Sequence, residues 1–284
     1  MTHPRRSWLF VPGADEQAQA AAARSGADVL IQELEDFTPP ELRARARALA
    51  ATLYGRWRAV GALAAVRVNS LETCGREDLE AVLAGKPDLV LMSKVARPEQ
   101  VQALAAIARG VQLVPNNESA AGLVRVGEIA RASPRVTALL VASEDMVADL
   151  GAERTRGGEE LAYVRARFLV ECRAAGVEAI DCPYTFSDVR GAAAEARVAR
   201  RLGYRMKSLV DPAHAAVINR ALSIQASEVS RARRVVQAFD RARAQGKERG
   251  RVDGRLVEVP VYAAAKRLLE QAARTPAPTR KKRG

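Results

Sequence analysis

The stretch Val136-Thr137-Ala138-Leu139-Leu140-Val141-Ala142-Ser143-Glu144-Asp145 decides the predicted fold. It is almost entirely apolar up to Ala142 and ends in two adjacent carboxylates. A continuous run rich in Val and Leu predicts a strand buried on both faces, as in parallel sheets. In parallel α/β folds the chemistry lies at the carboxyl ends of the strands. Glu144 and Asp145 are therefore candidate functional residues.

The same pattern, a short apolar strand followed by a helix, recurs along the chain. Eight strands are predicted, at residues 7–13, 27–34, 63–68, 88–92, 111–115, 136–142, 178–181 and 206–210. Helices are predicted at about 14–24, 40–54, 76–84, 98–109, 119–131, 145–150 with 159–175, 188–202 and 212–222. Alternating strands and helices predict a parallel sheet, and eight units predict a closed (β/α)8 TIM barrel. An open doubly wound sheet is the alternative, but only Pro12-Gly13 follows the first strand, where a glycine-rich phosphate loop would be needed.

The chain of 284 residues is longer than eight such units require. We assign residues 1–225 to the barrel and residues 226–274 to a C-terminal helical extension. The extension has predicted helices at 227–245 and 260–274, with a tight turn at 252–255 between them. Residues 275–284 contain two prolines and a basic cluster, and we expect a disordered tail there.

Composition excludes several classes of protein. No stretch approaches the roughly 20 apolar residues of a membrane span, and the start of the chain resembles no secretory signal. Three cysteines without metal-ligand spacing are typical of reduced thiols, so we expect a cytoplasmic protein with no membrane partner. Only two histidines, His3 and His214, are present, which excludes a histidine-rich metal site.

The net charge of +12 is unevenly placed. Residues 231–284 carry a net charge of +11, whereas residues 1–230 carry only +1. A basic region indicates an anionic ligand such as a polyphosphate, a membrane surface or nucleic acid. Aromatic residues make up only 4% of the chain, and Phe239 and Tyr262 are the two within residues 231–284. This scarcity weakens single-strand nucleic-acid binding, which uses several stacking platforms.

Charged residues end several of the predicted strands. They are Glu35, Asp36, Arg67, Lys94, Glu118, Glu144 and Asp145. Carboxylates gathered at a barrel mouth without histidine or cysteine suit a hard cation, Mg²⁺ or Mn²⁺. Arg67 offers a fixed fork of donors for a substrate carboxylate. Adjacent residues point in opposite directions, so we take Asp145 as the metal ligand and Glu144 as the partner of a neighbouring Lys or Arg.

With these residues in place, the chain resembles the citrate lyase β-subunit-like family, within the HpcH/HpaI aldolases and CoA-ester lyases. The resemblance runs from about Arg6 to Leu269. It rests on the order and spacing of short motifs: LFVPG (9–13), LED (34–36), VRVNSL (66–71), KV (94–95), VPNNESAAG (114–122), SEDMVADLG (143–151), AID (179–181), GYRMKSLVDP (203–212) and DGRLVEVP (253–260).

The resemblance implies a role for each matching residue. Glu118 and Asp145 would bind Mg²⁺, and Arg67 would grip the carboxylate of a 2-keto or 2-hydroxy acid. Glu35 and Asp36 would order the waters of the metal and nearby basic groups. The family also implies a homo-oligomer, a trimer or hexamer, in which the C-terminal segment covers the site of a neighbouring subunit. The acid/base Asp of the family corresponds to Glu258.

Several positions depart from the family pattern, and most of them lie near the expected substrate pocket. They are Glu33 for Asp, Ala96 for Glu, Asn116-Asn117 for an apolar pair, Val210-Asp211-Pro212 for Ile-His-Pro, His214 for Gln and Glu258 for Asp. These changes leave the metal ligands in place but alter the substrate half of the site, where we assign Asn116 and Lys94 to substrate binding.

The resemblance predicts a Mg²⁺-dependent lyase that cleaves a 3-hydroxyacyl-CoA of the citryl-, malyl- or citramalyl-CoA type to acetyl-CoA and a keto acid. Arg43 and Arg47 are candidates for holding the phosphates of CoA. Three alternatives stay open: a thioesterase acting on malyl-CoA or citramalyl-CoA, a CoA-independent keto-acid aldolase, and a non-catalytic subunit that binds a carrier protein or nucleic acid.

Overall fold

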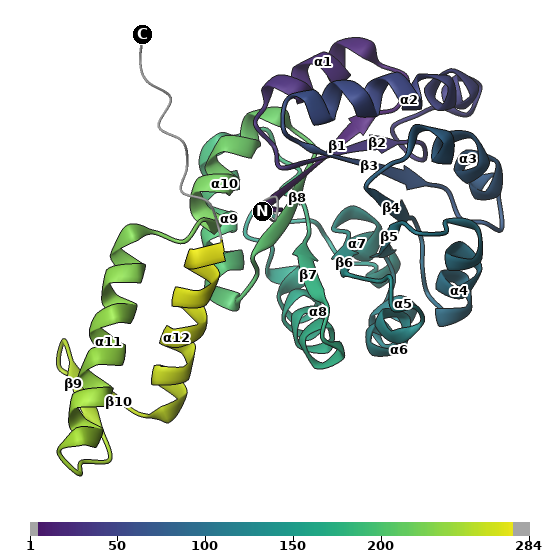
Figure 1. The fold of residues 1–284 in the computed structure, drawn as a ribbon. Helices are drawn as coiled ribbons and strands as arrows, with labels where there is room; N and C mark the ends of the chain where they lie inside the picture. Colours follow the sequence, from purple (N-terminus) through teal and green to yellow (C-terminus); the bar gives the residue numbers. More distant parts are fainter. Residues whose placement is uncertain (1–4, 275–284) are drawn as a thin grey trace, which may run out of the picture. The chain divides into compact units, whose positions relative to one another are not determined.

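The structure, a computed structural model, describes residues 5–274. Within that range the chain forms two compact units, residues 5–222 and residues 223–274 (Figure 1). The predicted tail, 275–284, lies outside the described residues.

Eight parallel strands close the first unit into a barrel in the order of the sequence. They are β1 (Ser7–Pro12), β2 (Val29–Glu33), β3 (Leu63–Val68), β4 (Leu89–Met92), β5 (Gln112–Asn117), β6 (Ala138–Val141), β7 (Glu178–Asp181) and β8 (Met206–Leu209). Pairing of β1 with β8, through Trp8 opposite Ser208, closes the ring. The predicted (β/α)8 TIM barrel is confirmed.

Ten helices surround the barrel (Figure 1). They are α1 (Glu16–Arg24), α2 (Arg43–Ala59), α3 (Gly75–Val82), α4 (Pro98–Ile107), α5 (Ala120–Leu123), α6 (Val126–Arg131), α7 (Glu144–Leu150), α8 (Ala162–Ala175), α9 (Val189–Leu202) and α10 (Ala215–Leu222). Two predictions were wrong in detail. The helix predicted at 119–131 is divided into α5 and α6, where Gly122 and Gly127 weaken a continuous helix. The helix predicted to end at Tyr54 continues to Ala59, because Trp57 on its next turn is buried.

β5 is also longer than predicted. The strand was expected to end at Pro115, but Asn116 and Asn117 continue it by pairing with Leu140 and Val141 of β6. Pro115 lies within this strand although proline donates no hydrogen bond to a neighbouring strand, which is why the sequence predicted an end there. The consequence is functional, because the alternation of the strand now extends through Asn116 to Glu118.

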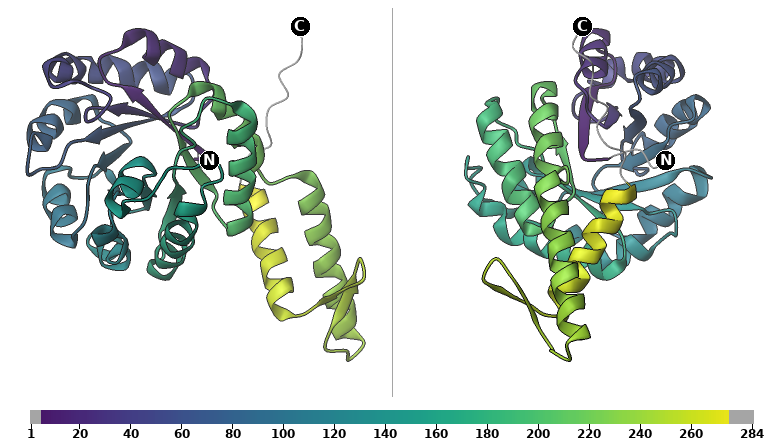
Figure 2. Two further views of the ribbon diagram at one scale, coloured as in Figure 1. Left: turned by 180° about the vertical axis from the view of Figure 1, so that it is seen from behind. Right: turned by 60° about the vertical axis from the view of Figure 1, so that its left-hand side comes forward.

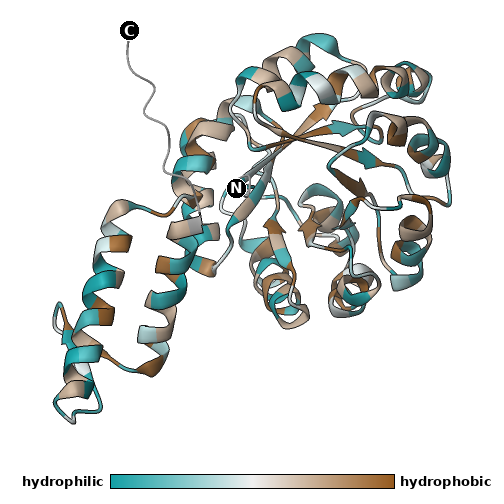
Figure 3. Cartoon of the chain, in the orientation of Figure 1, coloured by the Kyte–Doolittle hydropathy of each residue, from teal (hydrophilic) through white to brown (hydrophobic). Residues whose placement is uncertain are grey.

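Alternating side chains divide the apolar core into two layers. Inside the barrel lie residues such as Trp8, Ile31 and Ala65, while their neighbours along each strand face the helices. Hydrophobic residues are accordingly concentrated in the strands (Figure 3). The period of two therefore fixes which strand-end residues point into the mouth of the barrel.

The second unit is a helical hairpin with a small sheet. It consists of α11 (Ala226–Ala244), β9 (Gly250–Val252), β10 (Arg255–Val257) and α12 (Val259–Arg274). The predicted tight turn joins β9 to β10, with positive φ at Asp253 and Gly254, as two-residue hairpins require. α11 and α12 lie side by side (Figure 2), and Phe239 stacks on Tyr262 between them. No described helix combines the length and hydropathy that crossing a membrane would need.

A buried ion network lies between the barrel and its helices at β7 and β8. Asp181 accepts hydrogen bonds at 2.8 Å from both Arg165 of α8 and Lys207 of β8. Lys207 also lies 3.0 Å from Glu195 of α9. Burial acts to raise the pKa of Asp181, but Lys207 and Arg165 lower it overall. Two cations thus balance two carboxylates in this buried network.

We expect Lys207→Met to reduce the free energy of unfolding by about 3 kcal/mol, because it leaves buried carboxylates without one of their cations. Urea denaturation measures the change. Lys86→Met, which removes an exposed lysine, is the control and should change stability by less than about 0.5 kcal/mol. Equal effects of the two substitutions would contradict the role given to the network.

Candidate active site

The carboxyl ends of β2 to β6 bring most of the predicted site residues together. Arg67 is the last inward-facing residue of β3, and Glu35 and Asp36 follow β2. Lys94 follows β4 and Glu118 follows β5, while Asp145 lies in the first turn of α7. Because the strands are parallel, all these groups lie at the same end of the barrel.

Arg67 is the centre of this group. Its Nε donates to Glu33 Oε1 at 3.0 Å, and its Nη2 lies 3.4 Å from Glu35 Oε2. Asp36 and Glu118 both lie at 3.9 Å from its terminal nitrogens. The guanidinium is buried and lies over the Phe10 ring at 4.7 Å. Burial acts to lower the pKa of Arg67, but the carboxylates raise it overall, so the group stays charged.

Glu33 is a further residue of the site. The sequence indicated it only as a departure from the family pattern, which has Asp at this position. It is fully buried, and its carboxylate accepts hydrogen bonds from the backbone N–H groups of Glu35 and Phe37 at 2.5 and 2.6 Å. Burial raises its pKa. Glu33 therefore fixes both the orientation of Arg67 and the loop after β2. The signal was available in the sequence, since Glu33 lies in register with the inward residues Val29 and Ile31.

Lys94 and the acidic pair after β2 form a second set of contacts. Lys94 Nζ lies 2.7 Å from Glu35 Oε1 and 3.8 Å from Asp36 Oδ1. Its backbone has a φ of 55°, which turns the chain sharply after β4. Glu35 is thus held between Arg67 and Lys94, and its conformation is set by two cations.

Glu118 is one of the buried residues that this arrangement leaves without a hydrogen-bond partner. Its exposed fraction is 4%, and neither carboxylate oxygen has a hydrogen-bond partner within the described chain. Burial, together with the charges of Glu35 and Asp145, raises its pKa to about 8, against the lowering effect of Arg67. Burial and the charges of Asp36 and Glu35 also raise the pKa of Asp145.

The charge balance at the mouth favours a bound cation. Among residues 5–274, five carboxylates gather near only two cations, Arg67 and Lys94. The carboxylates are those of Glu33, Glu35, Asp36, Glu118 and Asp145. A divalent ion between Glu118 and Asp145 would relieve this repulsion, and their oxygens suit Mg²⁺. Across residues 5–274, no three His, Cys, Asp or Glu side chains gather as a metal-binding group. Two protein ligands would leave coordination positions for water or substrate.

Glu144 points away from this group, as predicted, but the reason is that successive residues of helix α7 are rotated by about 100°. Its side chain is exposed, accepts a hydrogen bond from Thr185 Oγ1 at 2.6 Å and lies 3.3 Å from Arg154 Nε. The expected pairing of Glu144 with a neighbouring basic residue is confirmed.

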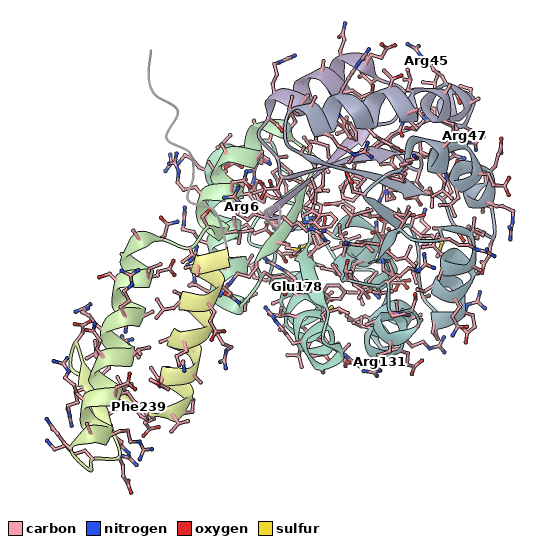
Figure 4. All side chains as sticks on the ribbon, viewed as in Figure 1. Arg6, Arg45, Arg47, Arg131, Glu178 and Phe239 are labelled. Carbon is pink, nitrogen blue, oxygen red and sulfur yellow. The ribbon has the colours of Figure 1, made fainter. Side chains whose placement is uncertain are left out.

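The two arginines predicted to hold CoA differ in whether acidic residues of the chain already pair with their guanidinium groups. Arg47 Nε donates to Asp78 at 2.9 Å, and Arg47 also contacts Glu77, so its guanidinium joins α2 to α3 (Figure 4). Arg43 contacts Cys74 Sγ at 3.4 Å, and its buried Nε has no partner among the described residues. Arg43 is therefore the better placed of the two to take an anion.

Glu258 belongs to the second unit, between β10 and α12. It is exposed and lies 3.4 Å from Arg249 of the same unit. Its assignment to acid/base chemistry stays a prediction.

A cavity of about 580 Å³ lies beside the loop that follows β2. Its lining includes Phe37, Leu42 and the ion pair of Arg45 with Glu16. The Phe37 ring lies 5.9 Å from the Arg67 guanidinium, which places this partly apolar cavity next to the charged mouth.

Comparison with known proteins agrees with this geometry. Residues 6–212, the whole barrel with its charged mouth, match the sequence profile of HpcH/HpaI aldolase/citrate lyase. The chain belongs to this family.

Relatives within the family have more than one activity. The chain is 34% identical to a (3S)-malyl-CoA thioesterase of Cereibacter sphaeroides over 95% of both chains. It is 32% identical to the citrate lyase β subunit of Escherichia coli over 95% of this chain and 94% of that one. Among solved structures, CitE of Mycobacterium tuberculosis in complex with magnesium, acetoacetate and coenzyme A is similar with a TM-score of 0.78 and 28% identity, over 95% of this chain and 98% of the other.

The raised pKa of Glu118 predicts how the stability of the metal-free protein depends on pH. Between the ordinary value of 4.5 and about 8, the folded state keeps a proton that the unfolded state releases. Unfolding free energy should therefore fall as pH rises through this window, by at most about 1.4 kcal/mol per unit. Glu118→Gln should remove this dependence and be the more stable protein at pH 8 by about 1–4 kcal/mol.

Chemical denaturation in EDTA at pH 5 and pH 8 measures both proteins. Glu144→Gln, which changes the adjacent exposed carboxylate, should behave as the unmodified chain. Parallel pH dependence in all three proteins would show that Glu118 titrates normally.

Proposed function

We propose that this protein is a Mg²⁺-dependent carbon–carbon lyase that cleaves a 3-hydroxyacyl-CoA carrying a distal carboxylate to acetyl-CoA and a keto acid. The observation that carries the proposal is the unsatisfied Glu118 carboxylate beside the buried Arg67 guanidinium. A cation site next to a fixed guanidinium suits a ligand with a carboxylate and an adjacent hydroxyl or keto oxygen.

Glu118 and Asp145 would hold the metal, and Mn²⁺ would fit the same oxygen ligands. When bound, Mg²⁺ supplies positive charge that stabilises a developing alkoxide and orients the substrate oxygens. The magnesium complexes of CitE support this choice of metal.

The residues of the chain position the substrate. Arg67 would donate two hydrogen bonds to the substrate carboxylate, in an orientation that Glu33 fixes from behind. Glu35 and Asp36 keep Lys94 at the rim, where its ammonium adds positive charge near the incoming anion.

The reaction requires a proton to move at each end of the broken bond. The hydroxyl of the substrate first loses its proton to a water that Glu35 or Asp36 would order. The carbonyl of the keto acid then forms as the bond between its carbon and the α-carbon of the acetyl group breaks, and the electrons of that bond pass to the α-carbon as the enolate of acetyl-CoA. Glu258 or a bound water would return a proton there.

The acyl-CoA would extend from the mouth into the cavity beside Phe37. The apolar lining suits the pantetheine arm, and Arg43 is available for a phosphate. By the family resemblance, the second unit of one subunit would cover the site of a neighbouring subunit. We therefore also expect a trimer or hexamer, which light scattering would detect.

A thioesterase acting on malyl-CoA is the second candidate. It is favoured by the 34% identity to the (3S)-malyl-CoA thioesterase over nearly the full length. The same site would then direct water to the thioester carbonyl rather than break a carbon–carbon bond.

Product analysis separates these two activities. We expect malyl-CoA, citramalyl-CoA or citryl-CoA, incubated with Mg²⁺ and the protein, to give acetyl-CoA and a keto acid, which mass spectrometry identifies. Free CoA with an intact hydroxy acid would instead establish the thioesterase. EDTA should stop either reaction.

Metal binding can be tested without turnover. We expect Glu118→Gln and Asp145→Asn to weaken Mg²⁺ binding by at least about tenfold in calorimetric titration, since each removes a ligand charge. Glu144→Gln is the matched control, because it changes the adjacent carboxylate that pairs with Arg154, and it should bind Mg²⁺ normally. Unchanged affinity in both ligand variants would refute the assigned site.

A further inference from the structure

One polar side chain that the sequence assigned to substrate binding makes no hydrogen bond in the arrangement described so far. Asn116 is fully buried at the end of β5, and neither its Nδ2 nor its Oδ1 has a hydrogen-bond partner among the described residues. Burying an amide without hydrogen bonds is unfavourable, so such groups are rare in folded proteins. An apolar side chain at this position would avoid the cost. The presence of an amide is explained if a bound ligand supplies the missing hydrogen bonds.

The alternation of β5 shows where this amide points. Val114 belongs to the interior cluster of the barrel and Leu113 to the layer beneath the helices. Asn116 therefore points inward with Val114, toward the end of the barrel where Glu118 follows. Asn117 faces the other way and packs against Gly122, where a Cβ atom would lie 2.6 Å from its Nδ2.

Asn116 lies inside the barrel, two residues before Glu118 on the chain. It lies in register with the inward residue Leu140 of β6. The amide is near enough to Glu118 to oppose, in part, the rise in the pKa of that carboxyl, although neither amide atom makes a hydrogen bond of ordinary geometry. A substrate bound beside Glu118 would therefore contact Asn116 with the substituent that projects into the barrel.

The chemistry of the amide selects among substituents. Hydrogen and methyl, the groups on glyoxylate and pyruvate, would leave both polar atoms unpaired. A carboxylate could accept from Nδ2 but would face Oδ1 without donating to it, in a mouth where carboxylates already exceed cations. A hydroxyl both donates and accepts, so it satisfies Nδ2 and Oδ1 together.

We propose that Asn116 hydrogen-bonds a hydroxyl group on the carbon next to the reacting carbonyl, so that the keto acid handled by this enzyme is a 3-hydroxy-2-oxo acid. This assignment rests on the proposed function and adds the substrate class to it. A site built to bind a hydroxyl rejects an analogue that lacks it, because its buried polar groups are then left unpaired.

The test uses a pair of keto acids of nearly equal size. Hydroxypyruvate carries CH₂OH where 2-oxobutanoate carries CH₂CH₃. With Mg²⁺ and acetyl-CoA in the condensation direction, kcat/KM should favour hydroxypyruvate by at least about tenfold. Asn116→Leu should reverse this order, while Asn219→Leu on α10 should leave it unchanged.

The melting temperature of Asn116→Leu distinguishes substrate binding from a purely structural role of Asn116. Replacing an unpaired buried amide by leucine should leave the melting temperature unchanged or raise it. Loss of stability together with an equal decline on both substrates would overturn the assignment, as would equal rates on both acids in the unmodified enzyme.

Failure of the proposed function is recognised separately. Glyoxylate, pyruvate and oxaloacetate are included in the same assay, and product from any of them without a preference for hydroxypyruvate overturns only the role of Asn116. If no acid gives a product, the lyase proposal fails. Calorimetric affinities of hydroxypyruvate and 2-oxobutanoate for both proteins then decide the assignment of Asn116 alone, and equal affinities overturn it.

Discussion

The contact between the Arg67 guanidinium and Glu33 is the interaction on which the site depends. Both groups are buried, and each would be costly to bury alone. Glu33 is held by two backbone N–H groups of the loop after β2, so the same carboxylate fixes the guanidinium and the loop that carries Glu35 and Asp36. A cation fixed in this way can bind a substrate carboxylate without first being ordered, which reduces the entropy lost on binding.

The barrel contains two groups of buried charges, which differ in whether the carboxylates are matched by an equal number of cations. Near β7 and β8, Asp181 and Glu195 are matched by Arg165 and Lys207, so that group is complete without a ligand. At the mouth, the carboxylates outnumber the cations and Glu118 has no hydrogen-bond partner within the described chain. This imbalance marks the mouth as the place where a cation adds to stability and function, whereas the balanced network joins strands to helices.

The same alternation that builds the core also assigns the functional residues. Inward positions are apolar in the lower part of the barrel and polar near the carboxyl ends, where Glu33, Arg67 and Asn116 replace the aliphatic residues below them. The outward neighbours of these residues pack against helices. A change of register by one residue would therefore remove the whole site from the mouth, so the site is as strongly specified as the fold.

The sequence by itself determined the eight strand–helix units, the closed barrel and the residues at its mouth, because strand periodicity and the position of a residue at a strand end are local properties. It also predicted that Glu144 and Asp145 diverge. The sequence could not determine which polar groups pair: Arg47 is held by Asp78, and Glu33 supports Arg67. Glu118 and Asn116 are left without hydrogen-bond partners among the described residues. From the sequence alone β5 was expected to end at Pro115, whereas pairing with β6 extends the strand to Asn117. These features arise from contacts between residues far apart in the chain, which exist only once the barrel has closed.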